Sequence, residues 1–252
     1  MWSRLDGLFW LVLMLLPLVA LQRLLHRQIQ AVFLILTRNP ALTMGLFSLL
    51  FFPGVFLHEL SHFLMARLLG VRTGDFSLIP QSLPDGRLQL GYVETAKTDL
   101  PRDALIGAAP LISGALVVAY IAMERLRLLP LWEVFRHGQL DLFWLGLTLL
   151  PRVPDFPIWF YLAFAVSSTM LPSASDRHAW LPLGLLIAAL LTLAWLAGAG
   201  PWLLENLAPL LNNFLRSLAT VLGLSAAIHA VLALPLVLLR KSLARLTGVD
   251  VA

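Results

Sequence analysis

The sequence predicts an all-α polytopic membrane protein with about six transmembrane helices and a small membrane-associated β-hairpin region. Of its 252 residues 59% are hydrophobic and only 13% are charged, whereas soluble domains average about 25% charged residues. Several uncharged stretches approach or exceed the roughly 20 residues that a helix needs to span a bilayer. One extended polar segment, residues 71–102, alternates apolar and polar residues as strands do. We expect a single integral membrane domain over residues 1–252.

Six apolar stretches without Asp, Glu, Lys or Arg carry the prediction of membrane-spanning helices. The first follows Arg4 and resembles a cleaved signal peptide, but no small-x-small cleavage site follows it, and Arg23 and Arg27 bound it like a helix end. We interpret it as a helix, with further interfacial pieces expected at residues 31–37 and 140–150. The six stretches are residues 7–22, 39–57, 104–123, 156–175, 179–204 and 217–239.

The β-hairpin is predicted at about residues 71–99. Its apolar residues alternate with polar ones on both sides of a Pro84-Asp85-Gly86 turn signal. The alternating residues are Phe76, Leu78, Leu88, Leu90 and Tyr92.

The charge distribution and the cysteine count limit the classes of partner and of metal ligand that this protein can have. The net charge is +4, but the basic residues scatter over loop ends without an aromatic-basic cluster, which indicates contact with the lipid bilayer and no nucleic acid. With no cysteine, any metal must be held by histidine and carboxylate. We expect a multi-pass protein of the cell membrane. The charges do not settle its orientation, and the sequence does not predict an oligomeric state.

The segment His58-Glu59-Leu60-Ser61-His62 matches the pattern H-E-x-x-H within an apolar stretch. Residues four apart share a helix face, so His58 and His62 can grip one metal ion while Glu59 serves as a base. The alternative is a helix with chance polar residues. Ionisable groups at membrane depth cost roughly 3 kcal/mol each on insertion scales, and a bound divalent ion would compensate them, so we predict metal binding.

A catalytic zinc site needs a third protein ligand. The candidates include several histidines and carboxylates, and Asp176 stands out because it lies where an apolar span breaks at Pro172 and resumes at Ala179. For His229 we predict an interhelical hydrogen bond. His178 is interpreted either as an outer contact of the site or as a solvated helix start.

These motifs together resemble the site-2 protease family of intramembrane zinc metalloproteases. The resemblance covers roughly residues 51–180, with a catalytic core at about 41–180, and rests on H-E-x-x-H, "GVRTGDFSL", "LQLGYVET", "GAAPLISG" and "TMLPSASD" in this order. It implies that Asp176 is the third zinc ligand. The sequence departs from the family pattern at Ala109, Ser113, Thr169 and Arg177, and it has no inserted PDZ-like domain, so it resembles a compact form.

The resemblance implies a Zn²⁺-dependent intramembrane endopeptidase that cleaves transmembrane segments of membrane proteins. His58, His62 and Asp176 would hold the ion, and Glu59 would activate a zinc-bound water. Two alternatives stay open: a non-catalytic scaffold of the same fold that binds transmembrane helices, and a membrane metalloenzyme with another substrate. The predicted substrate-binding residues are Leu88, Leu90, Gly91, Tyr92, Ser113 and Thr169.

Overall fold

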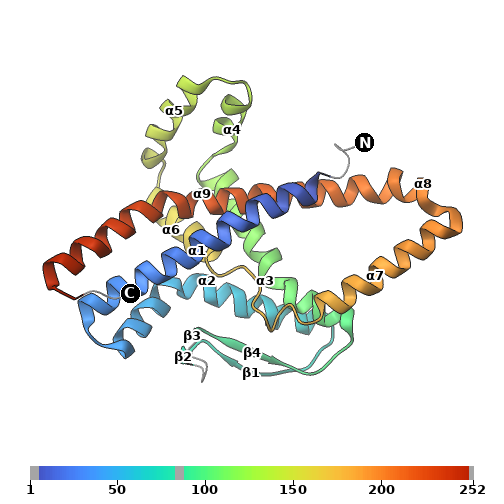
Figure 1. Cartoon of the computed structure of the whole chain (residues 1–252), viewed down its shortest axis with the longest axis horizontal. Coiled ribbons are helices and arrows are strands. Elements are labelled where there is room, and N and C mark those ends of the chain that lie inside the picture. The colour runs from blue at the N-terminus through green and yellow to red at the C-terminus, as the bar shows by residue number, and fades with distance from the viewer. Residues whose placement is uncertain (1–5, 83–87, 250–252) are drawn as a thin grey trace.

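The computed structural model describes residues 6–82 and 88–249 and is built mainly from long helices (Figure 1). The helices are α1 (Gly7–Thr37), α2 (Pro40–Leu68), α3 (Leu100–Tyr120), α4 (Leu129–Arg136), α5 (Leu140–Leu149), α6 (Phe156–Ser167), α7 (Trp180–Ala194), the short α8 (Gly200–Trp202) and α9 (Ala208–Thr247). The strands are β1 (Thr73–Ser77), β2 (Gln81–Ser82), β3 (Leu88–Gln89) and β4 (Tyr92–Thr95). π-helical turns at Ile121–Arg125, Trp195–Ala199 and Leu203–Leu207 and a 3₁₀ turn at Leu150–Arg152 complete the described elements.

The first and last long helices, α1 and α9, lie side by side and run in the same direction (Figure 1). The start of α1 meets the start of α9, where the Gly7 backbone N–H donates to Asn212 Oδ1 at 2.7 Å and Asp6 pairs with Arg216. Further along both helices, Leu18 packs with Leu222. The first and last long helices of the described chain are therefore joined along one long apolar seam.

Helices α2, α3 and α6 pack together beside this pair and form the rest of the core. The rings of Phe47 and Phe51 of α2 pack against each other at a tilted angle, and Phe51 also contacts Phe164 of α6. The Tyr161 hydroxyl donates to the Leu50 carbonyl at 2.9 Å, which ties α6 to α2. This aromatic cluster fixes α2, which carries the H-E-x-x-H segment, against α6, which leads into the loop that carries Asp176.

Four helical stretches are long and apolar enough to cross a membrane, which agrees with a membrane protein. They are Gly7–Thr37, Pro40–Leu68, Leu100–Arg125 and Trp180–Thr247. The last stretch contains two of the predicted spans, and its direction changes near Gly198, whose φ is 91°. The six predicted spans are thus not confirmed as six separate helices.

Two predicted spans differ in length from the helices observed. Helix α1 continues past Arg23 and Arg27 to Thr37, since long cationic side chains can keep their charged ends in a polar zone without interrupting a helix. Residues 156–175 were predicted as one span, but α6 ends at Ser167 and covers only 12 residues. The Thr169 hydroxyl donates to the Ala165 carbonyl, and Pro172 cannot continue a helical ladder.

The polar segment forms two small antiparallel sheets. β1 pairs with β4, with Ser77 opposite Tyr92, and β2 pairs with β3, with Gln81 opposite Gln89. The predicted Pro84-Asp85-Gly86 turn lies outside the described residues, so the complete hairpin stays a prediction. Both sheets lie along one side of α2 (Figure 1).

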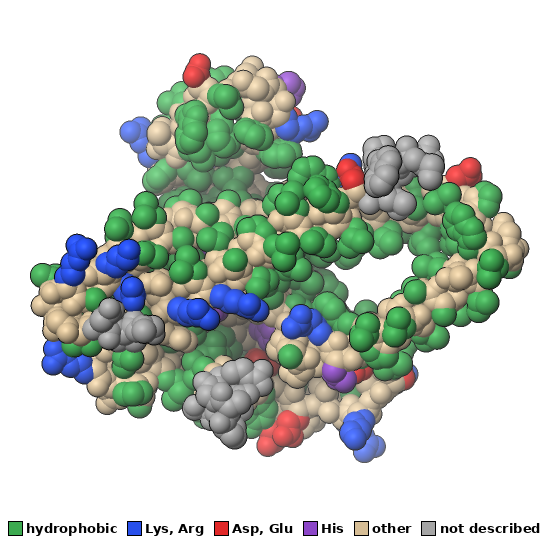
Figure 2. Space-filling view, in the orientation of Figure 1, with side chains coloured by type: hydrophobic (Ala, Val, Ile, Leu, Met, Phe, Trp, Pro, Cys, Tyr) green, Lys and Arg blue, Asp and Glu red, His purple; other side chains and the backbone are tan. Residues whose placement is uncertain are grey.

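Helices α4 and α5 pack against each other and project from the helical body (Figure 1). Figure 2 shows hydrophobic side chains over much of the visible face and several Lys and Arg side chains toward the end where α9 finishes. An apolar outer surface is what a bilayer requires of the protein that it surrounds.

Candidate metal centre

Helix α2 carries two of the candidate ligands and the candidate base. Asn39 caps its start, with the side-chain oxygen accepting hydrogen bonds from the backbone of Ala41 and Leu42. The helix continues without interruption through the H-E-x-x-H segment. His62 and Glu59 are buried, and Glu59 is only 8% exposed. One helix therefore holds Glu59 and His62 inside the protein and His58 in a partly buried position.

The loop after α6 brings Asp176 to the two histidines. Asp176 Oδ2 lies 3.6 Å from His58 Nε2, and Asp176 Oδ1 lies 3.5 Å from His62 Nε2. The two Nε2 atoms are 3.2 Å apart. The backbone N–H of Ser173 donates to Asp176 Oδ2 at 2.7 Å and fixes the carboxylate within its own turn. The structure thus groups His58, His62 and Asp176 as one possible metal-binding set.

The donor spacing is close to what a small ion needs. Ligand atoms about 2.0–2.1 Å from a tetrahedral Zn²⁺ are roughly 3.3–3.4 Å from each other. Each histidine Nε2 lies within a few tenths of an ångström of that distance from the other Nε2 and from one Asp176 oxygen, Oδ2 for His58 and Oδ1 for His62. His58 Nδ1 donates to the Thr169 carbonyl at 2.7 Å, and His62 Nδ1 donates to the Ile106 carbonyl at 2.8 Å. Because a carbonyl only accepts, both protons are on Nδ1, and both Nε2 lone pairs are available to a metal.

The charge state of Asp176 also suits a ligand. Burial by itself would raise the pKa of its carboxyl. The contacts with His58 and His62, whose Nε2 atoms can donate a proton when no metal is bound, and the Ser173 backbone N–H outweigh burial and hold the pKa well below its usual range. Glu59 interacts electrostatically with the same three groups. The carboxylate that would complete the site is therefore ionised without being exposed.

Three glycines let the ligand loop approach the helices closely. A Cβ atom on Gly107 of α3 would lie 1.9 Å from the Asp176 carbonyl oxygen, and one on Gly114 would lie 2.4 Å from Met170 Cβ. A Cβ on Gly54 of α2 would lie 2.3 Å from the Ala165 carbonyl oxygen. Gly107 and Gly114 thus allow close packing, which here positions the loop that carries Asp176.

The residues predicted to bind substrate occupy three different places. Gly91 is buried against Glu59, and a Cβ there would lie 2.9 Å from Glu59 Cγ. The Ser113 hydroxyl is 2.5 Å from the Ser61 hydroxyl inside the motif, and the Thr169 backbone orients His58 as described above. The remaining three lie on the strand segment, where Leu88 and Leu90 pack against the core and Tyr92 pairs with Ser77.

Two other histidines have partners away from the ligand set. His229 Nε2 is 3.0 Å from the Ser168 hydroxyl, which confirms the predicted interhelical hydrogen bond. His178 Nε2 lies 2.6 Å from Asp103 Oδ2 at the start of α3. Neither imidazole belongs to the group of three.

The sequence did not reveal the two backbone carbonyls that orient the histidines, those of Thr169 and Ile106, or the role of Gly54. Every residue has a carbonyl group, so no residue type marks these two positions. Gly54 had a usable signal, since it lies one helical turn before His58 in an otherwise bulky stretch.

No family model, curated protein or solved structure matches this chain. The resemblance to site-2 proteases therefore stays a prediction, and the geometry of the site is what supports a function for this protein.

Proposed function

We propose that the protein is a zinc-dependent intramembrane endopeptidase that cleaves transmembrane segments of other membrane proteins. The observation that carries the proposal is the convergence of His58, His62 and Asp176 from two segments far apart in the chain, with Glu59 buried beside them. Two imidazoles and one carboxylate form a three-ligand set of the kind that leaves zinc a position for chemistry.

Each residue of the site has a role in this proposal. A zinc ion held by the three ligands would polarise the substrate carbonyl and make water easier to deprotonate. Glu59 accepts the proton of the attacking water on its carboxylate and returns it to the leaving amine. The carbonyls of Thr169 and Ile106 keep the imidazoles oriented throughout, because they bind the Nδ1 protons.

The neighbouring strands supply the reason to propose a helical substrate. A peptide bond inside a helix has its carbonyl engaged, so the substrate must unwind locally before attack, and a strand edge offers its backbone replacement hydrogen bonds. Among the described strands β4 pairs only with β1, so its second edge has no strand partner there and could pair with such a segment. Gly91, directly before β4, contacts Glu59, so a segment paired along this edge would pass the base.

The test combines metal analysis with cleavage of a transmembrane peptide by the purified protein in lipid nanodiscs. Glu59→Gln should keep one zinc per chain and lose cleavage, since a base and not a ligand is removed. Asp176→Ala should lose both zinc and cleavage. Glu133→Gln is the matched control, because Glu133 is exposed and pairs with Arg136 on α4.

Three results would contradict the proposal. Zinc-loaded wild-type protein that cleaves none of a panel of transmembrane peptides would favour the scaffold hypothesis. Loss of zinc in Glu59→Gln would make Glu59 a ligand, and full cleavage by Glu59→Gln would remove it from the chemistry.

A further inference from the structure

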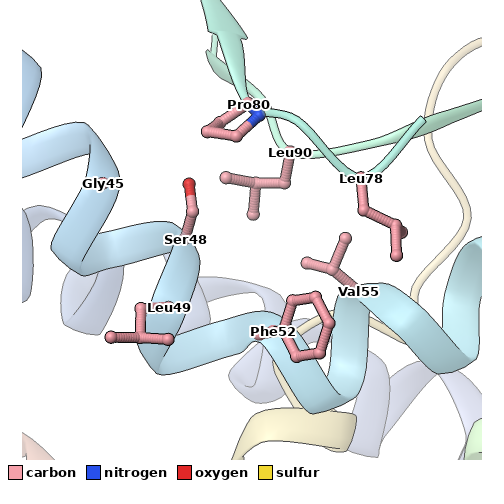
Figure 3. Close-up of a pocket in the computed structure, with 8 residues that line it drawn as sticks. All are labelled: Gly45, Ser48, Leu49, Phe52, Val55, Leu78, Pro80 and Leu90. Carbon is pink, nitrogen blue, oxygen red and sulfur yellow. The ribbon is translucent and has the colours of Figure 1, made fainter.

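A second feature lies close to the candidate metal centre: an open pocket between α2 and the strand segment (Figure 3). Its volume is about 240 Å³, which exceeds the roughly 150 Å³ of an apolar cavity that admits benzene. The lining is apolar apart from one hydroxyl, and that hydroxyl, on Ser48, donates to the Met44 carbonyl at 2.8 Å. The only side-chain hydroxyl among the residues that line the pocket is therefore already bonded within its own helix. Its walls include Ser48, Phe52 and Val55 from α2 and Leu78, Pro80 and Leu90 from the strand segment.

The helical wall of the pocket leads directly to the base. Ser48, Phe52, Val55 and Glu59 follow one another at spacings of four, three and four residues, so they form a single stripe on one face of α2. At 1.5 Å of rise per residue, Val55 lies about 6 Å and Phe52 about 10 Å from Glu59 along the helix axis.

The strand wall leads to the same point. Leu90 lines the pocket, and the next residue, Gly91, contacts Glu59. An extended chain advances about 3.3 Å per residue. A peptide that lies along this strand with its cleaved bond at Glu59 would thus hold a side chain over the pocket two to three residues from that bond.

We infer that this pocket is a specificity subsite that takes one large apolar side chain, of leucine or phenylalanine size, from the unwound substrate. The inference depends on the proposed function for the identity of the occupant, a peptide paired along the strand edge. The shape, the apolar lining and the continuity of both walls with Glu59 select an apolar side chain over a polar or charged one. Burial of that side chain would also hold the unwound segment in register with the base.

Gly45 offers a clean way to fill the pocket. It lies on the pocket wall at the start of the same stripe, and a Cβ atom there meets nothing within 4 Å. Gly45→Leu therefore adds bulk without a backbone clash and favours the helix. Gly184→Leu is the matched control, since Gly184 is also helical, exposed and open around its Cβ but lies on α7. Phe52→Ala enlarges the pocket instead.

The experiment uses a panel of transmembrane peptides with a mapped cleavage site and Ala, Leu, Phe or Asp at each of the three positions on either side. Wild-type protein should prefer Leu or Phe over Ala and Asp at one position two or three residues from the cleaved bond, by roughly tenfold or more. Gly45→Leu should remove that preference and leave cleavage of the Ala peptide within about twofold. Gly184→Leu should behave as wild type, and Phe52→Ala should shift the preference toward larger side chains.

A binding measurement tests the subsite independently of proteolysis. The same peptides are titrated against the Glu59→Gln protein, with and without Gly45→Leu, and dissociation constants are measured by energy transfer in nanodiscs. Cleavage with no side-chain preference at these positions, or a preference that Gly45→Leu leaves unchanged, overturns the subsite and leaves the protease proposal intact. Absence of cleavage together with a binding preference that Gly45→Leu removes supports the subsite and overturns the protease proposal.

Discussion

Gly107→Ala gives a sensitive test of how the third ligand is positioned. The added Cβ would lie 1.9 Å from the Asp176 carbonyl oxygen, whereas real Cβ atoms stay beyond about 3.0 Å from such atoms. Because the clash is with backbone, no side-chain rotation relieves it. The loop must retreat by roughly 1 Å, which is several times the ±0.2 Å within which metal–ligand distances are held.

We expect Gly107→Ala to weaken zinc binding by about 10- to 100-fold, or roughly 1.4–2.7 kcal/mol, the range found when residues that support a ligand are changed. Loss of the helix does not explain such an effect, since Ala is favoured over Gly in a helix interior by about 1 kcal/mol. The assay is competition for zinc with a chromophoric chelator on the purified protein. Gly184→Ala, where the new methyl group has open space, serves as the control. Wild-type affinity in Gly107→Ala would refute the reasoning.

Three further predictions concern contacts around the site and at the start of α1. Gly91→Ala should keep zinc yet slow cleavage by about tenfold, since the new Cβ presses on Glu59 and small displacements of catalytic groups are costly; steady-state kinetics with metal analysis checks this, and an unchanged rate contradicts it. His229→Ala should keep zinc while lowering the unfolding free energy by about 1–3 kcal/mol, because it leaves a buried hydroxyl without its partner; zinc loss would place His229 in the site. The hydrogen bond from Arg216 holds the pKa of Asp6 below its usual range, so the pair contributes stability near neutral pH that is lost as the pH falls through the folded-state pKa. The unfolding temperature of wild type should exceed that of Asp6→Asn at pH 7, and the gap should shrink as the pH falls below about 4. A gap that stays the same at acidic pH would contradict the ion pair.

The sequence predicts the local part of the site well and its long-range part poorly. His58, Glu59 and His62 fall on one helix, so their spacing alone determines that they share a surface. Asp176 is more than a hundred residues away. A break in an apolar span marked it as a candidate, and only resemblance to a known family implied that it is the third ligand. The structure groups it with the two histidines.

For the membrane helices too, the sequence predicted local features better than long-range ones. Apolar composition located the long helices, since every backbone group in lipid must be satisfied within a helix. Composition did not locate the end of α6, because Ser167, Ser168 and Thr169 are uncharged and look compatible with a span. Their hydroxyls bond to nearby backbone or to His229, and the chain leaves the helix there to carry Asp176 toward α2.

The parallel pairing of α1 and α9 constrains how the chain threads the bilayer. If two helices cross a membrane in the same direction, the chain between them must cross the membrane an odd number of times. With α1 and α9 both crossing, the total number of crossings is odd, and Asp6 and Gly248 face opposite compartments. Six crossings would place them in the same compartment, so a parallel outer pair is incompatible with six crossings and requires an odd number.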